Sequence, residues 1–341
     1  MLVSAVVDAG LREEVEAGHR PLPDFLKLER ELGVELLDWS RLGVTAGGRS
    51  WNRSARQVRV AWPLLDHYEV VFSDGEHLGI PLALALRGFR RGPAHVSIAH
   101  HLLTPAKRPF FRLLQAQKGT QALVVHSSAQ KERYERELAI DSRLLSVVPY
   151  GVDTRFWHPS IGAGDNVVLS PGREQRDHRT LAAACASLDT DVIVTAGSAH
   201  SPASRLHSPD HWPANLSRRT FSYLDLRSAY QDAALVVVPL VECTFAAGIT
   251  TVLEGMAMGK AVVASATAAI AEVIEDGVTG RLVAPGDQRE LRAAVQGLLA
   301  DHRERLRLGA NAREACQAEF SLDRFAERLG GVFKNAHVAR R

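Results

Sequence analysis

Short runs of apolar residues, many of them β-branched, alternate along the whole chain with longer segments of mixed polarity. Unbroken apolar runs of this kind indicate strands that are buried on both faces, as in parallel sheets, and the segments between them have helical periodicity. The pattern therefore predicts two series of strands. The first series is Leu2–Val7, Val34–Leu37, Glu69–Ser73, His95–His100, Leu123–His126 and Ser146–Pro149. The second series is Asn166–Ser170, Asp191–Ala196, Leu235–Pro239, Ala261–Ala264 and Arg281–Val283.

The two series are separated by a segment rich in turn-forming residues, Tyr150–Gly164, which we predict to be a linker. A chain of 341 residues is long enough for two domains. We therefore expect two doubly wound, Rossmann-like α/β domains at 1–152 and 164–320. They should face a central cleft, because ligands bind outside the carboxyl ends of such strands. An apolar stripe on a final helix at about 321–336 predicts that this helix packs back on the first domain.

Composition and charge exclude several classes of protein. With a net charge of +2 and no nucleic-acid-binding motif, the chain is not expected to bind nucleic acid. The three cysteines, Cys185, Cys243 and Cys316, lie far apart and form neither a disulfide framework nor a metal-ligand spacing. No apolar run approaches the roughly 18–20 residues that span a bilayer. These features favour a cytoplasmic protein, and we expect no cofactor and no bound metal.

The most informative stretch is 246–260, where a glycine-containing loop runs into a short helix that precedes a buried strand. The loop supplies Gly248, Ile249, Thr250 and Thr251, for which an ordinary helix cap is the alternative to a binding role. Unpaired backbone N–H groups and the positive end of the helix dipole point to the same place, which suits a phosphate. Glu254 lies about one and a half turns into the helix, where its carboxylate can accept hydrogen bonds from the hydroxyls of a nucleotide ribose. Its small, apolar neighbours argue against an ordinary solvated position.

Two arginines follow Gly172, which is placed to end the first strand of the second series and to turn the chain. The guanidinium groups of Arg173 and Arg176 can cap a diphosphate with bidentate hydrogen bonds. They can also stabilise the negative charge that grows on a phosphate when it leaves a substrate. We therefore predict that both arginines act in catalysis. The alternative is that they are solvated loop charges that pair with Glu174 and Asp177.

Four motifs carry a resemblance to a known family: VVPYGVDTRF (147–156), LSPGREQRD (169–177), the loop, helix and strand at 246–265, and EVIEDGVTGRLV (272–283). In this order they resemble the retaining GT-B glycosyltransferases of the large family four, over residues from about 120 to 335. The resemblance implies a GT-B fold and transfer of a sugar from a UDP-, GDP- or ADP-sugar, with retention of anomeric configuration. The implied acceptor is a carbohydrate, a lipid-linked molecule or a small molecule, as in polysaccharide or glycolipid biosynthesis. In the mechanism proposed for the family, the leaving phosphate takes the acceptor proton, and fixed cations replace a metal.

The chain departs from the family pattern at two positions. Tyr150 stands where asparagine is usual, and Ala246 stands where many members have a glutamate that touches the transferred sugar. Glu242 lies four residues further upstream and is the alternative carboxylate if the loop folds differently. The missing glutamate leaves two other functions open, a non-catalytic nucleotide-sugar-binding subunit and a sugar-nucleotide epimerase. The retained Arg173 and Glu254 favour an active transferase.

Polar residues also follow two predicted strands of the first domain. His100 and His101 end one of them, and the resemblance places a histidine that faces the cleft at about this position, where it can donate a hydrogen bond to the sugar or the acceptor. Because neighbouring side chains of a strand point to opposite faces, only one of the two is expected in the cleft, with His100 preferred. A structural role for both histidines remains the alternative. Asp74 and Glu76 follow the strand that ends at Ser73 and are candidate acceptor-binding residues, unless their loop merely caps the next helix.

Two further motifs are weaker. Asp189-Thr190-Asp191 matches the metal-binding Asp-x-Asp pattern of the other glycosyltransferase fold, but it immediately precedes a predicted strand and should be a solvated turn. The segment 106–114 mixes cations with aromatic residues, as an interfacial membrane segment does. An ordinary helix that begins at Pro109 fits equally well. A peripheral contact with the inner face of the membrane therefore stays open.

Overall fold

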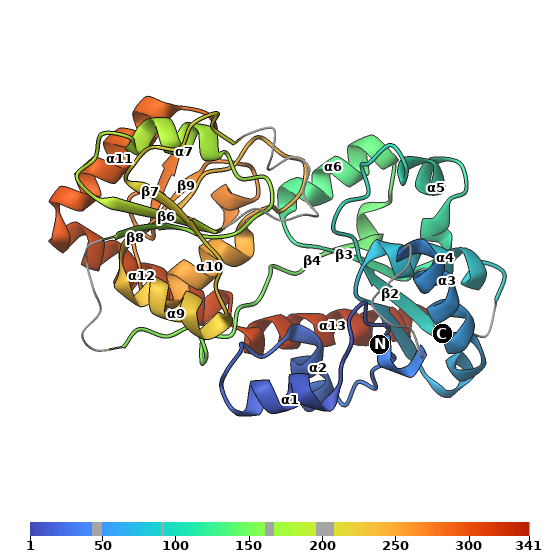
Figure 1. Ribbon diagram of the computed structural model, residues 1–341. Helices are drawn as coiled ribbons and strands as arrows, with labels where there is room; N and C mark the ends of the chain where they lie inside the picture. Colours follow the sequence, from blue (N-terminus) through green and yellow to red (C-terminus); the bar gives the residue numbers. More distant parts are fainter. Residues whose placement is uncertain (43–49, 90–91, 161–166, 196–207, 341) are drawn as a thin grey trace. The chain divides into compact units, whose positions relative to one another are not determined.

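The chain folds into two compact units in the computed structural model, which describes residues 1–42, 50–89, 92–160, 167–195 and 208–340 (Figure 1). Unit 1 comprises Met1–Ala17, Leu22–Pro149 and Phe325–Arg341. Unit 2 comprises Gly18–Pro21 and Tyr150–Arg324. Each unit is described by itself below.

Unit 1 contains a four-stranded parallel sheet in the order β1-β2-β3-β4. Its strands are β1 (Val70–Ser73), β2 (Ala94–Ile98), β3 (Ala122–Val125) and β4 (Leu145–Val147). Its α-helices are α1 (Ala9–Glu16), α2 (Asp24–Leu32), α3 (Ser50–Ala61), α4 (Glu76–Leu86), α5 (Arg108–Arg112) and α6 (Ser128–Leu138). Short 3-10 helices span Ser40–Leu42, Trp62–His67, Ala116–Gly119 and Ser142–Leu144.

The first two predicted strands, Leu2–Val7 and Val34–Leu37, are present only as isolated β-bridges. Leu2 pairs in parallel with both Leu37 and Ser73, but no longer ladder forms. The reason lies two residues further on, where the backbone N–H of Ser4 donates to the Asp74 carboxylate at 2.6 Å rather than to a neighbouring strand. The sequence prediction of these two strands is therefore wrong in extent, although Leu2 does lie beside β1 and Leu37 beside Leu2.

Unit 2 contains a six-stranded parallel sheet in the order β10-β9-β8-β5-β6-β7. Its strands are β5 (Val167–Ser170), β6 (Asp191–Thr195), β7 (Leu216–Arg219), β8 (Ala233–Val238), β9 (Val262–Ser265) and β10 (Arg281–Val283). Its α-helices are α7 (His178–Cys185), α9 (Tyr223–Asp232), α10 (Ile249–Ala257), α11 (Gln288–Ala300) and α12 (His302–Glu319), and a 3-10 helix spans Ile270–Glu272. Two residues of the predicted strands, Asn166 and Ala196, lie outside the described residues.

One strand of unit 2, β7, is absent from the sequence prediction. It lies at the edge of the sheet beside β6. Of its four residues only Leu216 is buried, and Ser217, Arg218 and Arg219 are exposed. An edge strand with a single buried apolar residue lacks the apolar run on which the prediction rests.

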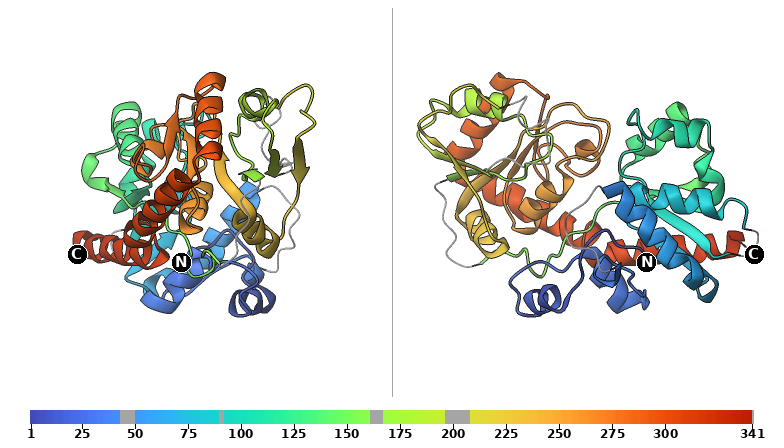
Figure 2. Two further views of the ribbon diagram at one scale, coloured as in Figure 1. Left: turned by 90° about the vertical axis from the view of Figure 1, so that its left-hand side faces the viewer. Right: turned by 45° about the vertical axis from the view of Figure 1, so that its right-hand side comes forward.

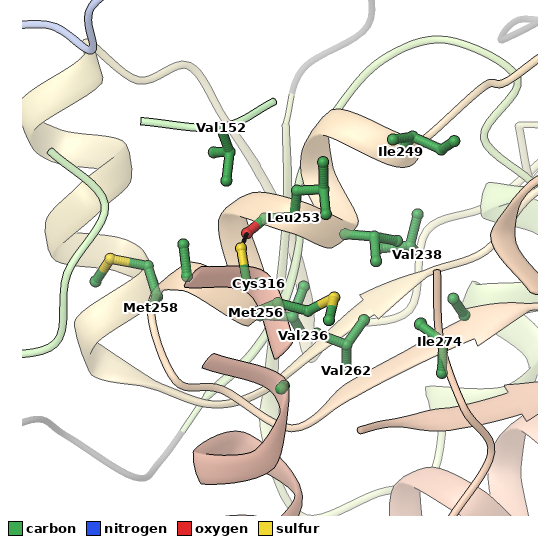
Figure 3. Packing of buried hydrophobic residues seen from close by; sticks show 14 of the residues in the cluster. Val152, Val236, Val238, Ile249, Leu253, Met256, Met258, Val262, Ile274 and Cys316 are labelled. Atoms are coloured by element: carbon green, nitrogen blue, oxygen red, sulfur yellow. Dashed lines mark hydrogen bonds between the residues drawn. The ribbon is translucent and has the colours of Figure 1, made fainter. Parts of the chain in front are cut away.

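Two apolar clusters cover the two faces of the unit 2 sheet, so that the sheet has helices on both sides (Figure 2). On one face, Val236, Val238 and Val262 of the sheet pack against Leu253 and Met256 of α10 (Figure 3). On the other face, buried residues of α7 and α11 pack against the alternate side chains of the same strands. This double layer is the doubly wound arrangement that the sequence predicts.

The helix α13 (Leu322–Arg340) is longer than the predicted segment and belongs to unit 1 from Phe325 onward. Its buried Phe325, Ala326 and Leu329 lie in one cluster with side chains of the unit 1 sheet. The rings of Phe72 and Phe333 lie 5.1 Å apart. The apolar stripe of this helix is therefore buried against the sheet of unit 1.

The described part of the predicted linker, residues 150–160, makes ordered contacts within unit 2. The backbone N–H of Val152 donates to the carbonyl of Phe320 at 2.8 Å, and that of Leu322 donates to the carbonyl of Val152 at 3.1 Å. Trp157 is buried. The last four residues of the predicted linker, 161–164, lie outside the described residues.

Candidate functional site

The end of β5 lies against the beginning of α10 in unit 2, and a glycine makes the approach possible. Gly172 has a φ of +87°. A Cβ atom at this position would lie 1.9 Å from Nη2 of Arg176 and 2.8 Å from Oγ1 of Thr251. Both the backbone conformation and the lack of space therefore require glycine here.

Arg176 is a buried cation at this junction, with only 2 % of its surface exposed. Its Nε donates to the carbonyl of Pro171 at 3.0 Å, its Nη1 to the carbonyl of Glu174 at 2.8 Å, and its Nη2 to Oγ1 of Thr251 at 2.8 Å. Burial lowers the pKa of Arg176 to about 10, so the guanidinium stays charged at neutral pH. Among the described residues, no carboxylate forms an ion pair with it.

The first turn of α10 presents backbone N–H groups. Gly248 precedes the helix with a φ of +79°, and no side chain of the described residues caps the helix. The first N–H groups of a helix have no partner within it, so those of Ile249 and Thr250 remain available for an anion. Thr250 is exposed, whereas the side chain of Ile249 lies in the apolar core.

Glu254 lies one turn further along α10 and is partly buried. Its Oε2 accepts a hydrogen bond of 2.9 Å from the hydroxyl of Tyr230, which is completely buried on α9. No other residue in the described ranges hydrogen-bonds to this carboxylate. Burial raises the pKa of Glu254 to about 7, against the opposing effects of Tyr230 and Arg176. A carboxylate with one oxygen engaged and a raised pKa is suited to accept hydrogen bonds from a ligand.

Most of the remaining residues of unit 2 that the sequence analysis singles out lie on its surface. Arg173 is exposed and makes no hydrogen bond or ion pair with any described residue. Glu242 is also exposed, and Ala246 is partly buried, so neither fills the position of a second buried carboxylate. Asp189 and Asp191 are exposed at the start of β6, as expected for a solvated turn.

Unit 1 holds its predicted residues at the carboxyl ends of β1 and β2, in loops and at the start of α4. The buried carboxylate of Glu76, the first residue of α4, engages both of its oxygens. Oε2 accepts from the backbone N–H of His100 at 3.0 Å and Oε1 from that of His101 at 3.2 Å. Lys107 Nζ donates to Oε1 at 2.6 Å and to the carbonyl of His101 at 3.2 Å. Burial raises the pKa of Glu76, but the charge of Lys107 and the hydrogen bond from it outweigh burial and hold the pKa below its usual value.

The side chains of Asp74, His77 and His100 gather beside this loop. His100 Nε2 donates to the backbone carbonyl of Asp74 at 3.1 Å. The Oδ2 of Asp74 accepts from the N–H and the hydroxyl of Ser4 at 2.6 and 2.7 Å. Burial raises the pKa of Asp74 and lowers that of His77, whose ring lies over Gly75. Histidines and a carboxylate at the ends of adjacent strands form a polar site that can bind sugar hydroxyls.

In the described part of the chain, no three histidine, cysteine, aspartate or glutamate side chains come close enough to hold a metal ion. A search of the same residues finds no helix that is both long enough and apolar enough to cross a membrane. In the segment 106–114, Phe111 is buried, whereas Leu113 and Leu114 are 79 % and 47 % exposed.

Two family profiles match the chain. The profile described as "Glycosyltransferase Family 4" matches residues 19–156, and the profile described as "Glycosyl transferases group 1" matches residues 166–301. The chain belongs to this glycosyltransferase family. Its members are retaining enzymes with the GT-B fold that use nucleotide-sugar donors, so the family predicted from the motifs is confirmed.

Curated relatives of this glycosyltransferase carry specific names. The "MMP alpha-(1->4)-mannosyltransferase" of Mycolicibacterium hassiacum is 27% identical over 369 residues, which cover 98% of this chain and 86% of that protein. The "Alpha-maltose-1-phosphate synthase" of Mycobacterium tuberculosis is 31% identical over 245 residues. That match covers 62% of each protein, so this chain spans less than two thirds of the length of the synthase.

Solved structures confirm the GT-B fold of the glycosyltransferase. A glycosyltransferase from Rickettsia africae superposes with a TM-score of 0.73 and 16% identity, covering 98% of this chain and 97% of that one. The Anabaena protein HepE, in complex with UDP-glucose, gives a TM-score of 0.72 at 18% identity, with 98% and 91% covered. Sucrose-phosphate synthase from Thermosynechococcus elongatus gives 0.70 at 21% identity, with 85% and 80% covered.

Two side chains at these sites are absent from the sequence predictions for the glycosyltransferase. Tyr230 contacts Glu254 across 24 positions of sequence, and nothing in the local pattern of α9 indicates it. The buried His126 follows β3, and its ring stacks on that of His100 at 5.3 Å. Its position at the carboxyl end of a strand, like that of His100, is a signal that could have identified it.

Proposed function

We propose that unit 2 binds the nucleoside diphosphate of the donor where β5 meets the first turn of α10. The observation that carries the proposal is the buried Arg176, a cation without a carboxylate in contact among the described residues. Burial of an unpaired charge costs free energy, which an anionic phosphate of the ligand offsets. The available N–H groups of Ile249 and Thr250 supply further hydrogen bonds to that phosphate.

In this proposal each of the other residues around the phosphates has its own role. Gly172 keeps the approach to Arg176 open, and Thr251 orients the guanidinium. Glu254 accepts hydrogen bonds from the ribose. The exposed Arg173 acts on the charge that develops on the β-phosphate as the donor bond breaks.

We propose that unit 1 binds the acceptor through Asp74, His77 and His100. Glu76 and Lys107 then hold the loop that carries His100, since both oxygens of Glu76 are already engaged. During transfer, the bond between the anomeric carbon and the phosphate oxygen breaks and the bond to the acceptor oxygen forms on the same face. The acceptor proton passes to the leaving phosphate, so no protein base is required.

The names of the relatives suggest the class of sugar. A mannosyltransferase and a maltose-1-phosphate synthase both handle hexoses, and a structural neighbour was solved with UDP-glucose. We therefore propose that the donor is a nucleotide-linked glucose or mannose and that the acceptor is a carbohydrate or a sugar-containing molecule.

A thermal-shift panel tests the donor site. UDP, GDP, ADP and their glucose and mannose derivatives are added separately, and the matching nucleotide should raise the melting temperature by mass action. The best donor is then incubated alone and with a pool of phosphorylated sugars and glycolipids. An epimerase would convert the donor alone, and a binding subunit would convert nothing. Product that appears only with an acceptor, with retained configuration by NMR, supports the proposal, and inversion would refute it.

A peripheral membrane contact is a second proposal, favoured by the exposed Leu113 and Leu114 in unit 1. The exposed cations Arg112 and Lys118 lie near them in the sequence. Exposed leucines next to cations suit the surface of an anionic bilayer. Such a contact would bring the enzyme to a lipid-linked acceptor.

A further inference from the structure

We propose that Tyr230 is a positioning residue for the donor, because its hydroxyl holds the Glu254 carboxylate in the orientation that receives the ribose. The inference rests on the proposed function, in which Glu254 serves the ribose. It assigns a role to a side chain that touches no reacting atom and that acts through its neighbour.

The first argument is the rigidity of Tyr230. Its side chain is completely buried on α9, and its ring packs edge-on against that of the buried Trp157, with 5.5 Å between the ring centroids. A tyrosine ring fixed in this way has a hydroxyl at one point in space. That hydroxyl lies 2.9 Å from Oε2 of Glu254. A flexible glutamate side chain thus gains a fixed partner for one oxygen and keeps the other oxygen for a ligand.

The second argument is that Tyr230 also touches the phosphate end of the site. Its hydroxyl lies 3.4 Å from the backbone carbonyl of Thr251. The side chain of Thr251 accepts from Arg176 at 2.8 Å. One buried hydroxyl therefore connects the carboxylate for the ribose with the turn that orients the cation for the phosphate. The distance between these two groups must match the distance between ribose and diphosphate in a nucleotide.

The third argument is chemical. Tyr230 remains protonated at neutral pH, since burial and the neighbouring Glu254 raise its pKa well above its usual value. Its hydroxyl therefore keeps the proton that it donates to Glu254. The charged or titratable groups that influence Glu254 are Tyr230 and Arg176, and both favour its ionised form. Loss of the tyrosine hydroxyl removes the hydrogen bond and leaves Arg176 in place.

The test is calorimetric titration of UDP, GDP and ADP and their 2′-deoxy forms into wild type, Tyr230→Phe, Glu254→Ala and Glu254→Asp. Wild type should bind the best nucleotide roughly tenfold more tightly than its 2′-deoxy form. In Tyr230→Phe the ratio of the two affinities, ribonucleotide over 2′-deoxynucleotide, should fall from about ten to about two or less. Only the ribonucleotide should bind more weakly. Glu254→Asp keeps the charge and the tyrosine but shortens the reach, and it should behave like Tyr230→Phe. The matched control is Tyr134→Phe, which removes another buried tyrosine hydroxyl in unit 1 and should leave the ratio unchanged.

The outcomes distinguish failure of the proposed role of Glu254 from failure of the proposed role of Tyr230. If Glu254→Ala keeps the wild-type ratio, Glu254 does not serve the ribose and the proposed role of this residue fails. If Glu254→Ala abolishes the ratio but Tyr230→Phe and Glu254→Asp keep it, only the positioning role fails. If Tyr230→Phe weakens the ribonucleotide and the deoxynucleotide equally, the tyrosine supports the fold alone and the inference is overturned. Measuring the same affinity ratio against pH adds a second readout. The pH at which the ratio is half-maximal should be higher in Tyr230→Phe, because the hydrogen bond from Tyr230 lowers the pKa of Glu254.

Discussion

Two buried or partly buried glutamates, one in each unit, differ in how their charge is satisfied. Glu76 in unit 1 engages both oxygens with two backbone N–H groups and Lys107, and its pKa lies below the usual value. Glu254 in unit 2 has a single hydrogen-bond partner among the described residues, and burial raises its pKa to about 7. The first carboxylate is saturated by its own chain, and the second has capacity left for a ligand.

The comparison indicates which polar groups stabilise the fold and which are available to bind a ligand. A carboxylate whose two oxygens are both hydrogen-bonded within the chain holds a loop in place. Its removal therefore displaces the residues of that loop. An unsaturated carboxylate or cation destabilises the free protein and is retained where a ligand completes it. On this basis Arg176 resembles Glu254 more than Glu76, since no counter-ion contacts it in the described residues.

The largest expected effect is that of Gly172→Ala, which should weaken nucleoside diphosphate binding about 100-fold by calorimetry. A Cβ atom would displace the Arg176 guanidinium from its three hydrogen bonds, and the backbone at φ +87° disfavours alanine. Together these costs amount to about 2–4 kcal/mol. The control is Gly286→Ala, which has a φ of +78° but no atom within 4 Å of the added Cβ. Equal affinities in the two variants would show that the space around Arg176 does not matter.

Arg173→Ala should lower kcat by roughly 100-fold and change donor KM little, because the guanidinium is proposed to act on charge that develops during departure. Steady-state kinetics with saturating acceptor measure both constants. Arg179→Ala serves as the control, since Arg179 is likewise exposed in unit 2. Parallel losses in kcat and in donor affinity would instead make Arg173 an ordinary binding residue.

Glu76→Gln tests the saturated carboxylate. The variant leaves Lys107 without its counter-ion and weakens the hydrogen bonds that Glu76 accepts from the backbone of His100 and His101. Transfer to the acceptor should fall about tenfold while nucleotide affinity stays unchanged, because the donor site lies in the other unit. Glu29→Gln, which breaks the surface ion pair with Arg12, should affect neither. A loss of nucleotide affinity in Glu76→Gln would contradict the separation of the two sites.

The two glutamates also predict opposite dependences of stability on pH. Folded Glu254 holds its proton up to about pH 7, whereas the unfolded residue loses it near 4.5, so its contribution to stability falls as pH rises between these values. The melting temperature of Glu254→Gln, measured without ligand, should therefore exceed that of wild type by a few degrees at pH 8 but not at pH 4.5. For Glu76, with its lowered pKa, stability is instead lost as pH falls below about 4.5. A melting temperature of Glu254→Gln that follows wild type at every pH would remove the argument that this carboxylate is unsaturated.

The same contrast explains how much could be predicted from sequence. The two α/β units and the loop at Gly248 follow from apolar runs and from a short motif, because their geometry is local. The polar site of unit 1 depends on contacts such as Ser4 with Asp74, and Tyr230 reaches Glu254 from a different helix. Pairings between distant segments leave no periodic signal. The burial of Arg176 likewise could not be read from a loop that also contains exposed charges.

The smallest expected effect concerns the exposed leucines of unit 1. If Leu113 and Leu114 contact a bilayer, replacing both with serine should reduce binding to anionic vesicles severalfold, since two partly inserted leucines contribute only about 1 kcal/mol. Sedimentation with phosphatidylcholine vesicles, with and without phosphatidylglycerol, measures the binding. The control is Leu306→Ser, because Leu306 is 59 % exposed on α12 of unit 2 and is not part of this segment. Equal sedimentation of wild type and the double variant would remove the membrane contact, and it would leave the donor and acceptor sites untouched, since neither depends on these side chains.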